Sequence, residues 1–230
     1  MSLEATEIIR DVNLLAECKS NVFFDVDGTL ADIHSEVISF VNMLYKTKYE
    51  LNDITDWNFT GCWKKYVDEE YSFLKEKRKY AYFNKDYEES AKGMTLFFVD
   101  HVYYGWEKFW KNVMPMECGL ANVLEGLEFD VVTANVNSEN IKNWLGLQGL
   151  KPKNFAQVPV GLDKMSLGYL VVFEDNPNEL KNRREGQHLF FKKRPWNEKP
   201  VDEYLKAGGE NVYLFNSFSR VVSKAFNFLE

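Results

Sequence analysis

Short apolar segments that end in polar residues occur once near the start of this sequence and then alternate with helical patterns through its second half, and this arrangement constrains the fold more than any other feature. The clearest segments lie within 21–30, 129–135 and 169–175, where runs of Val, Phe and Leu stop at a carboxylate or a hydroxyl. Further strands are expected at 155–160, 187–192 and 211–215, and helices at 63–80, 94–112, 118–127, 138–147, 176–185 and 217–229. Alternating strands and helices favour a parallel sheet with helices on both faces, so we predict an α/β fold.

The first strand is separated from the others by a long stretch in which no alternation of strand and helix occurs. Residues 33–112 instead carry apolar side chains mostly at helical spacing. We therefore predict a core formed by 1–32 and 113–230, with a helical cap at 33–112 inserted after the first strand. A further amphipathic helix is expected at about 3–18, ahead of the core.

Composition excludes several classes of protein. Among 230 residues, 35 acidic side chains outnumber 28 basic ones and give a net charge of −7, so we expect no nucleic-acid polymer as a partner. No apolar run approaches the roughly 20 residues that a membrane span requires, and the acidic first residues do not predict a secretory signal. Cys18, Cys62 and Cys118 are widely spaced and form no CxxC pair, which argues against a disulfide framework or a zinc site. We expect a cytoplasmic protein, and a homodimer is left open.

Polar residues gather where the predicted strands end. They are Asp25 and Asp27 after the first strand, Thr133, Ala134 and Asn135 after the second, and Glu174 and Asp175 after the third, with Lys164 between the last two groups. In parallel α/β sheets, ligands bind beyond the carboxyl ends of the strands. We therefore expect four acids, a hydroxyl and a lysine to meet at one edge of the sheet.

The acids in this set predict a metal site. Residues i and i+2 share one face of a strand, so Asp25 and Asp27 can approach a single point. With Asp175 added, the natural neutraliser is a hard divalent cation with oxygen ligands, and Mg²⁺ fits best. The bland alternative is that Asp25 is a simple cap and Asp27-Gly28 a simple turn.

This order of motifs resembles the haloacid dehalogenase-like superfamily, in its phosphatase branch. Residues 25–32, DVDGTLAD, look like the first motif of that superfamily. Thr133 resembles its second motif, Lys164 its third, and Glu174-Asp175 its acidic fourth. The resemblance implies a Rossmann-like core and gives the helical insertion the position of a cap domain.

A narrower resemblance links three segments to the 5′(3′)-deoxyribonucleotidase family. These segments are 114–127, 163–177 and 188–197, the last of which ends in Pro195-Trp196-Asn197. The sequence departs from that family at Glu174, where an Asp is usual, and at Ala134, where a Ser is usual.

The resemblance implies a role for each residue at the strand ends. Asp25 would attack phosphorus, and Asp27 would protonate the leaving alcohol and later activate water. Mg²⁺ would be held by Asp25, the backbone carbonyl of Asp27 and Asp175, while Glu174 would orient its waters. The phosphate would be bound by Thr133, Ala134, Asn135 and Lys164, and Ile33 would lie near the base of a nucleotide.

We therefore expect a Mg²⁺-dependent phosphomonoester hydrolase that acts on a small phosphate ester, most readily a nucleoside monophosphate. A phosphatase or phosphomutase for sugar phosphates or other small metabolites would use the same core, and a catalytically degenerate binding protein is the non-enzymatic alternative. Lys192, Lys193 and Arg194 are interpreted as solvated loop charges that add positive potential near the site at most.

Overall fold

The computed structural model describes residues 20–45, 47–54, 107–135, 137–159 and 161–229. The chain divides into two compact units, one formed by Met1–Ile33 with Trp110–Glu230 and the other by His34–Phe109. The helices predicted at 3–18 and 63–80 lie outside the described residues. Most of the second unit does too, so a helical cap at 33–112 stays a prediction.

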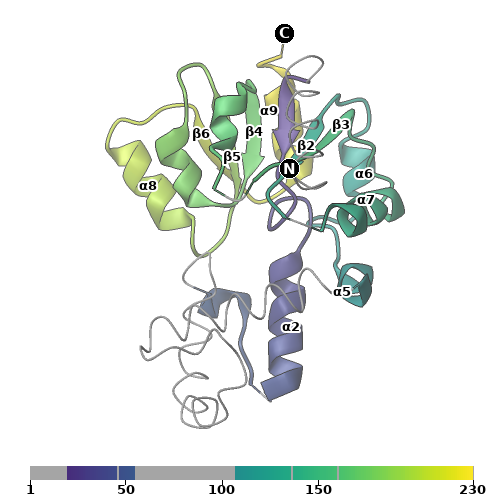
Figure 1. The fold of residues 1–230 in the computed structure, drawn as a ribbon. Coiled ribbons are helices and arrows are strands. Elements are labelled where there is room, and N and C mark those ends of the chain that lie inside the picture. The colour runs from purple at the N-terminus through teal and green to yellow at the C-terminus, as the bar shows by residue number, and fades with distance from the viewer. Residues whose placement is uncertain (1–19, 46, 55–106, 136, 160, 230) are drawn as a thin grey trace. The chain divides into compact units, whose positions relative to one another are not determined.

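The first unit is built on one parallel sheet of six strands (Figure 1). The strands are β1 (Val22–Phe24), β2 (Asp130–Thr133), β3 (Asn154–Gln157), β4 (Val171–Glu174), β5 (His188–Lys192) and β6 (Val212–Phe215). Their order is β3-β2-β1-β4-β5-β6, and every neighbouring pair is parallel. This confirms the predicted Rossmann-like α/β fold.

The strand order places a switch point beside β1. From β1 the chain adds β2 and β3 on one side, and it then adds β4, β5 and β6 on the other. Connections that leave in opposite directions open a crevice at the carboxyl ends of the central strands. Residues that follow β1, β2 and β4 therefore share one edge of the sheet.

Both faces of the sheet are buried, which explains the nearly continuous apolar runs of its strands. On one face, Phe23 and Val172 belong to a cluster that is covered by η3 (Lys164–Leu167), η4 (Pro177–Asn182) and α8 (Glu198–Lys206). Successive residues of a strand point to opposite faces, so Phe24 and Phe173 lie on the other side.

That second face is an aromatic layer. Phe24 stacks on Phe173 at 4.2 Å between ring centroids, and Phe173 stacks on Phe190 at 4.9 Å. Phe218, the first residue of α9 (Phe218–Phe226), packs on both Phe24 and Phe173. Aromatic residues make up 16% of the chain, and this layer contains several of them.

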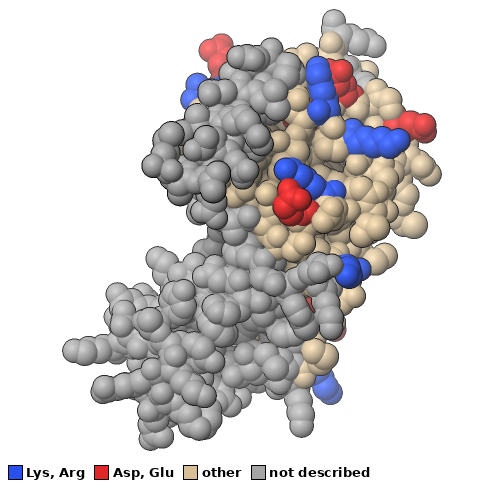
Figure 2. All heavy atoms as spheres, turned by 45° about the vertical axis from the view of Figure 1, so that its right-hand side comes forward, with Lys and Arg blue, Asp and Glu red and all other residues tan. Residues whose placement is uncertain are grey.

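Five further helices are described. They are α2 (Ile33–Tyr45), η1 (Leu51–Asp53), α5 (Glu107–Asn112), α6 (Leu120–Val123) and α7 (Ser138–Leu147). Of these, α2 and η1 belong mainly to the second unit. No described helix is long and apolar enough to cross a membrane. On the face drawn in Figure 2, the described basic side chains are interspersed with acidic ones and form no continuous patch.

Three local predictions differ from the structure. The helix expected at 118–127 is limited to α6, and the one expected at 176–185 is the 3₁₀ helix η4. Helix α8 was not predicted, because its polar sequence EKPVDEYLK includes Pro200 and buries only Val201. Proline is tolerated in the first turn of a helix, where N–H groups have no partner within the helix.

Candidate active site

Asp25 follows β1 directly, at the centre of the sheet. Its backbone N–H donates to Phe173 O at 3.0 Å, so the hydrogen-bond ladder with β4 extends one residue beyond the strand. The chain then closes a tight turn in which the N–H groups of residues 29–31 all donate to Val26 O. Gly28 adopts a φ of 72° in this turn, which glycine takes without steric cost. The turn keeps Asp25 and Asp27 together at the end of β1.

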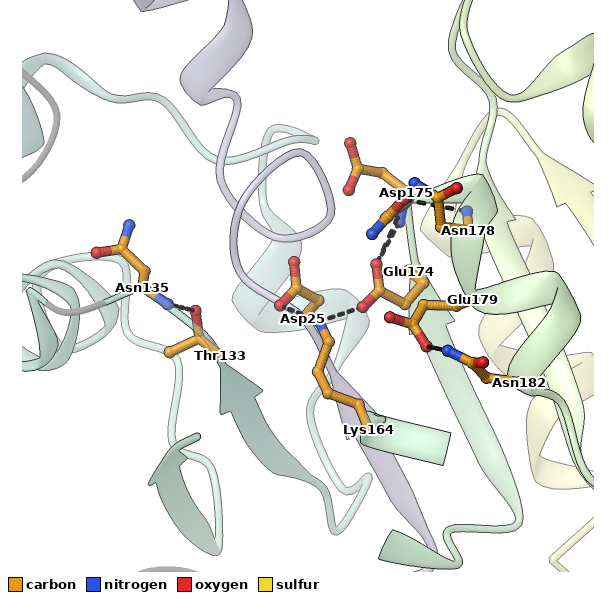
Figure 3. A network of polar contacts seen from close by, with 10 residues as sticks. Asp25, Thr133, Asn135, Lys164, Glu174, Asp175, Asn178, Glu179 and Asn182 are labelled. Atoms are coloured by element: carbon orange, nitrogen blue, oxygen red, sulfur yellow. Dashed lines mark hydrogen bonds and ion pairs between the residues drawn. The ribbon is translucent and has the colours of Figure 1, made fainter. Parts of the chain in front are cut away.

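Lys164 reaches this point from the first residue of η3. Its Nζ donates to Asp25 Oδ1 at 2.8 Å and also pairs with Glu174 Oε1. The three side chains are 10%, 9% and 0% exposed, respectively. Figure 3 shows the ammonium group between the two carboxylates. A buried ion pair with this geometry fixes the position of Asp25 because both partners are shielded from water.

Three buried carboxylates form a cluster beside Lys164. Asp25, Glu174 and Asp175 each offer one oxygen, and these oxygens all lie within 4.8 Å of one another. The second oxygen of Glu174, Oε2, accepts the backbone N–H groups of Asp175 at 3.0 Å and Asn176 at 3.2 Å. Carboxylate oxygens at this spacing suit a hard divalent cation, and Mg²⁺ is bound in proteins by one or two such groups.

The pKa shifts of the clustered acids also indicate a site that suits a divalent cation. Burial raises the pKa of Asp25 well above its ordinary value, although the nearby Lys164 charge opposes the shift. Burial, together with the charges of Glu174 and Asp25, likewise raises the pKa of Asp175. Burial also raises the pKa of Asp27 to about 6, against a hydrogen bond that favours its ionised form. Without a further cation, these acids resist ionising together, and a divalent ion is what would let them do so.

Lys164 stays charged in this setting. Burial alone would lower the pKa of its ammonium group, but the carboxylates of Asp25 and Glu174 outweigh that effect and raise the pKa above its ordinary value. The site therefore has a permanent positive charge at the carboxylate that we expect to be the nucleophile.

The end of β2 supplies the hydroxyl on the other side of Asp25. Thr133 is buried, and its Oγ1 accepts the backbone N–H of Asn135 at 3.1 Å. The Asn135 amide in turn donates to Asp27 Oδ2 at 3.0 Å. Ala134, between them, is half-buried and packs against the core cluster of the sheet. Figure 3 shows Thr133 and Asn135 on the opposite side of Asp25 from Glu174.

The structure thus brings the predicted residues of the strand ends to one edge of the sheet. Ile33, the first residue of α2, is 2% exposed. Its contact with a nucleotide base stays a prediction.

Comparison with known proteins gives the fold. No protein-family model and no curated protein sequence matches the chain. Among solved structures, a haloacid dehalogenase-like family hydrolase from Streptococcus pneumoniae is similar at a TM-score of 0.50 and 13% identity, over 88% of this chain and 96% of that one. The fold is that of the haloacid dehalogenase-like hydrolases.

Two other solved structures match at lower TM-scores. L-2-haloacid dehalogenase from Xanthobacter autotrophicus matches at a TM-score of 0.47 and 11% identity, over 88% of this chain and 97% of that one. β-Phosphoglucomutase from Clostridium difficile matches at a TM-score of 0.41 and 11% identity, over 91% of this chain and 98% of that one. The narrower resemblance to deoxyribonucleotidases stays a prediction.

Two basic residues at and just after the end of β5 are more buried in this haloacid dehalogenase-like fold than the sequence led us to expect. Lys192 and Arg194 were interpreted as solvated, yet they are only 8% and 7% exposed. Arg194 Nη2 donates to Asp32 Oδ1 at 3.3 Å and contacts Met116 Sδ. Lys193 alone of the three is exposed, and it pairs with Glu198.

Asn197 lies beside the carboxylate cluster and comes from the same loop. Its side chain is fully buried, and its Nδ2 donates to the backbone oxygens of Asp175 at 3.1 Å and Lys192 at 2.8 Å. It thereby ties the segment after β5 to the segment after β4. One signal in the sequence pointed to Asn197, its position at the end of the Pro-Trp-Asn match.

Proposed function

We propose that this chain is a Mg²⁺-dependent phosphomonoester hydrolase that works through an aspartyl-phosphate on Asp25. The observation that carries the proposal is the buried cluster in which Asp25 meets Lys164, Glu174 and Asp175. Transfer of a phosphoryl group is catalysed mainly by positioning and by positive charge around its oxygens. A carboxylate beside a fixed ammonium group and a cation site meets both needs.

The acidic groups of the site would have different roles in binding the cation. Asp25 and Asp175 would bind it together with the backbone carbonyl of Asp27. Glu174 has one oxygen on Lys164 and the other on two backbone N–H groups, so its main task would be to hold Lys164 in place. When bound, Mg²⁺ would screen the repulsion between the nucleophile and the phosphate.

The reaction follows in two displacement steps. In the first, an Asp25 oxygen bonds to phosphorus, the bond from phosphorus to the ester oxygen breaks, and Asp27 gives its proton to the departing alcohol. In the second, Asp27 takes a proton from water as that water attacks phosphorus, which releases inorganic phosphate and restores the Asp25 carboxylate. Lys164 and the Thr133 hydroxyl would stabilise the charge on the phosphoryl oxygens.

The proposed substrate is a nucleoside monophosphate. Its support is the resemblance of the segments 114–127, 163–177 and 188–197 to deoxyribonucleotidases. Asn197 lies in the last of these segments and reaches the backbone of Asp175. A preference for sugar phosphates in the assay below would leave the reaction intact and replace the substrate.

The test compares hydrolysis of p-nitrophenyl phosphate, dTMP, dUMP and glucose 6-phosphate, with Mg²⁺ and with a chelator. We expect the wild-type chain to require Mg²⁺ and to prefer the nucleotides. Asp25→Asn should abolish turnover, because uncatalysed hydrolysis of monoesters is slower by up to ~10²¹-fold. Asp202→Asn is the matched control, the same substitution at an exposed position of α8, and should leave the rates unchanged. Activity that survives Asp25→Asn or the chelator would contradict the mechanism.

A further inference from the structure

Asn135 is anchored on three sides just beyond β2. Its backbone N–H donates to Thr133 Oγ1 at 3.1 Å, and its side-chain Oδ1 accepts the backbone N–H of Asn137 at 2.9 Å. Its side-chain Nδ2 donates to Asp27 Oδ2 at 3.0 Å. With 3% of the residue exposed, water competes little for these contacts. Both polar ends of the side chain are thus engaged within the protein.

The orientation of this amide follows from its partners. The backbone N–H of Asn137 can only donate, so the amide atom that faces it must be the oxygen. The atom that faces Asp27 is therefore the nitrogen, which can only donate. The contact fixes Asp27 Oδ2 as a hydrogen-bond acceptor.

The other oxygen of Asp27 is in a different position. Asp27 Oδ1 is buried and has no hydrogen-bond partner within the described part of the chain. A neutral carboxyl group carries one proton, and the oxygen that accepts an amide N–H is the one that remains unprotonated. The proton is thereby directed to Oδ1.

We infer that Asn135 is a positioning residue that acts through Asp27, holding its Oδ2 so that Oδ1 presents the proton to the leaving alcohol. This inference rests on the proposed function, since it assigns the role of Asn135 within that reaction. It differs from the phosphate contact expected for Asn135 from the sequence.

If Asn135 positions Asp27, the loss of activity on removing the Asn135 amide should depend on the leaving group of the ester. An alkoxide is a poor leaving group and must be protonated as its bond to phosphorus breaks, so alkyl esters depend on a well-placed acid. p-Nitrophenolate leaves without a proton, and its transfer step therefore tolerates a misplaced Asp27. The ratio kcat/KM reports this first step for both kinds of ester, because it includes no step after the alcohol has left.

The experiment measures kcat/KM for dTMP, glycerol 2-phosphate and p-nitrophenyl phosphate in the wild type and two variants. Asn135→Ala removes the amide, and Asn135→Asp keeps the acceptor for Asn137 but loses the donor to Asp27. A positioned general acid contributes about 10²–10⁴-fold, so we expect both variants to lower kcat/KM at least ~10-fold for the alkyl esters and less than ~3-fold for the aryl ester.

Asn154→Ala provides the matched control. It deletes another Asn–Asp hydrogen bond of the same sheet, from Asn154 Nδ2 to Asp130 Oδ1 at 2.9 Å, where β2 and β3 begin. It should not change the ratio between the esters. If both Asn135 variants lower all rates equally, or leave the alkyl esters unaffected, the inference is overturned while the proposed function stands. If the wild type hydrolyses no ester, the proposed function falls and takes the inference with it.

Discussion

Replacing Lys164 by methionine tests how the site is held together. The substitution keeps the length and much of the apolar stem of the side chain but removes the charge that pairs with Asp25 and Glu174. All three side chains are at most 10% exposed, so solvent cannot take over the lost contacts. Two carboxylates are then buried without their partner.

The expected cost is large. Removing one member of a buried ion pair costs about 3–5 kcal/mol, because the remaining charge is uncompensated. For 230 residues, each kcal/mol lowers Tm by about 2–4 °C, which gives a loss of about 6–20 °C at pH 8 in the presence of a chelator. The loss should shrink at pH 5.5. Lys164 opposes the rise in the pKa of Asp25, so without it this carboxyl group takes up a proton more readily and becomes neutral.

Thermal unfolding followed by circular dichroism measures the effect, and Lys153→Met is the matched control. Lys153 pairs with Glu128 at 2.7 Å, nearly the distance of 2.8 Å between Lys164 and Asp25, but these side chains are 38% and 66% exposed. An exposed pair contributes about 0–1 kcal/mol, so Lys153→Met should change Tm little. Equal losses in the two variants, or a Lys164→Met loss that does not depend on pH, would refute the argument from burial.

Two further predictions concern stability. With a chelator present, Tm of the wild type should fall as pH rises from about 4 to about 6, because burial raises the pKa of Asp27 from its ordinary 3.8 to about 6 and ionising this group therefore costs more in the folded chain than in the unfolded one. Asp25 and Asp175, whose pKa values burial also raises, should add to the fall. Mg²⁺ should remove much of this fall, and a flat profile without it would count against the acid cluster. Asp130→Ala should lower the free energy of unfolding in urea by about 3 kcal/mol or more, because it leaves three donors, Ser20 N, Tyr169 OH and Asn154 Nδ2, without their acceptor at a buried site. A loss below about 1 kcal/mol would mean that other groups satisfy these donors.

The sheet and its polar edge could be predicted from the sequence because burial on both faces leaves a simple signal. Strands β1, β2 and β4 are buried throughout, so their segments of sequence are mainly apolar and end at polar residues, although Asp130 interrupts the run at β2. Once the sheet is parallel, chain direction alone places Asp25, Thr133 and Asp175 at the same edge. Helix α8 lacked such a signal, since it buries only one residue.

The partners of each polar group could not be predicted in the same way. The expected role of Glu174 in orienting waters of the metal stays a prediction, while its contacts with Lys164 and two backbone N–H groups were not predicted. Which of several acids a lysine meets depends on side-chain directions in three dimensions. The burial of Lys192 and Arg194 is of the same kind, because their neighbours Asn216 and Asp32 come from distant parts of the chain.

The charges of the site connect its stability to its proposed chemistry. Asp25, Asp27, Glu174 and Asp175 would carry four negative charges if all were ionised, against one positive charge on Lys164. Like charges about 4 Å apart repel by roughly 4 kcal/mol at an effective dielectric constant of about 20, so a phosphate dianion would be excluded from such a site. Protons on the acids relieve this repulsion, but a protonated Asp25 is no nucleophile. A divalent cation would relieve it while leaving Asp25 ionised. The cluster that we expect to destabilise the metal-free fold as pH rises is therefore the one that we propose binds Mg²⁺ and a phosphate ester together.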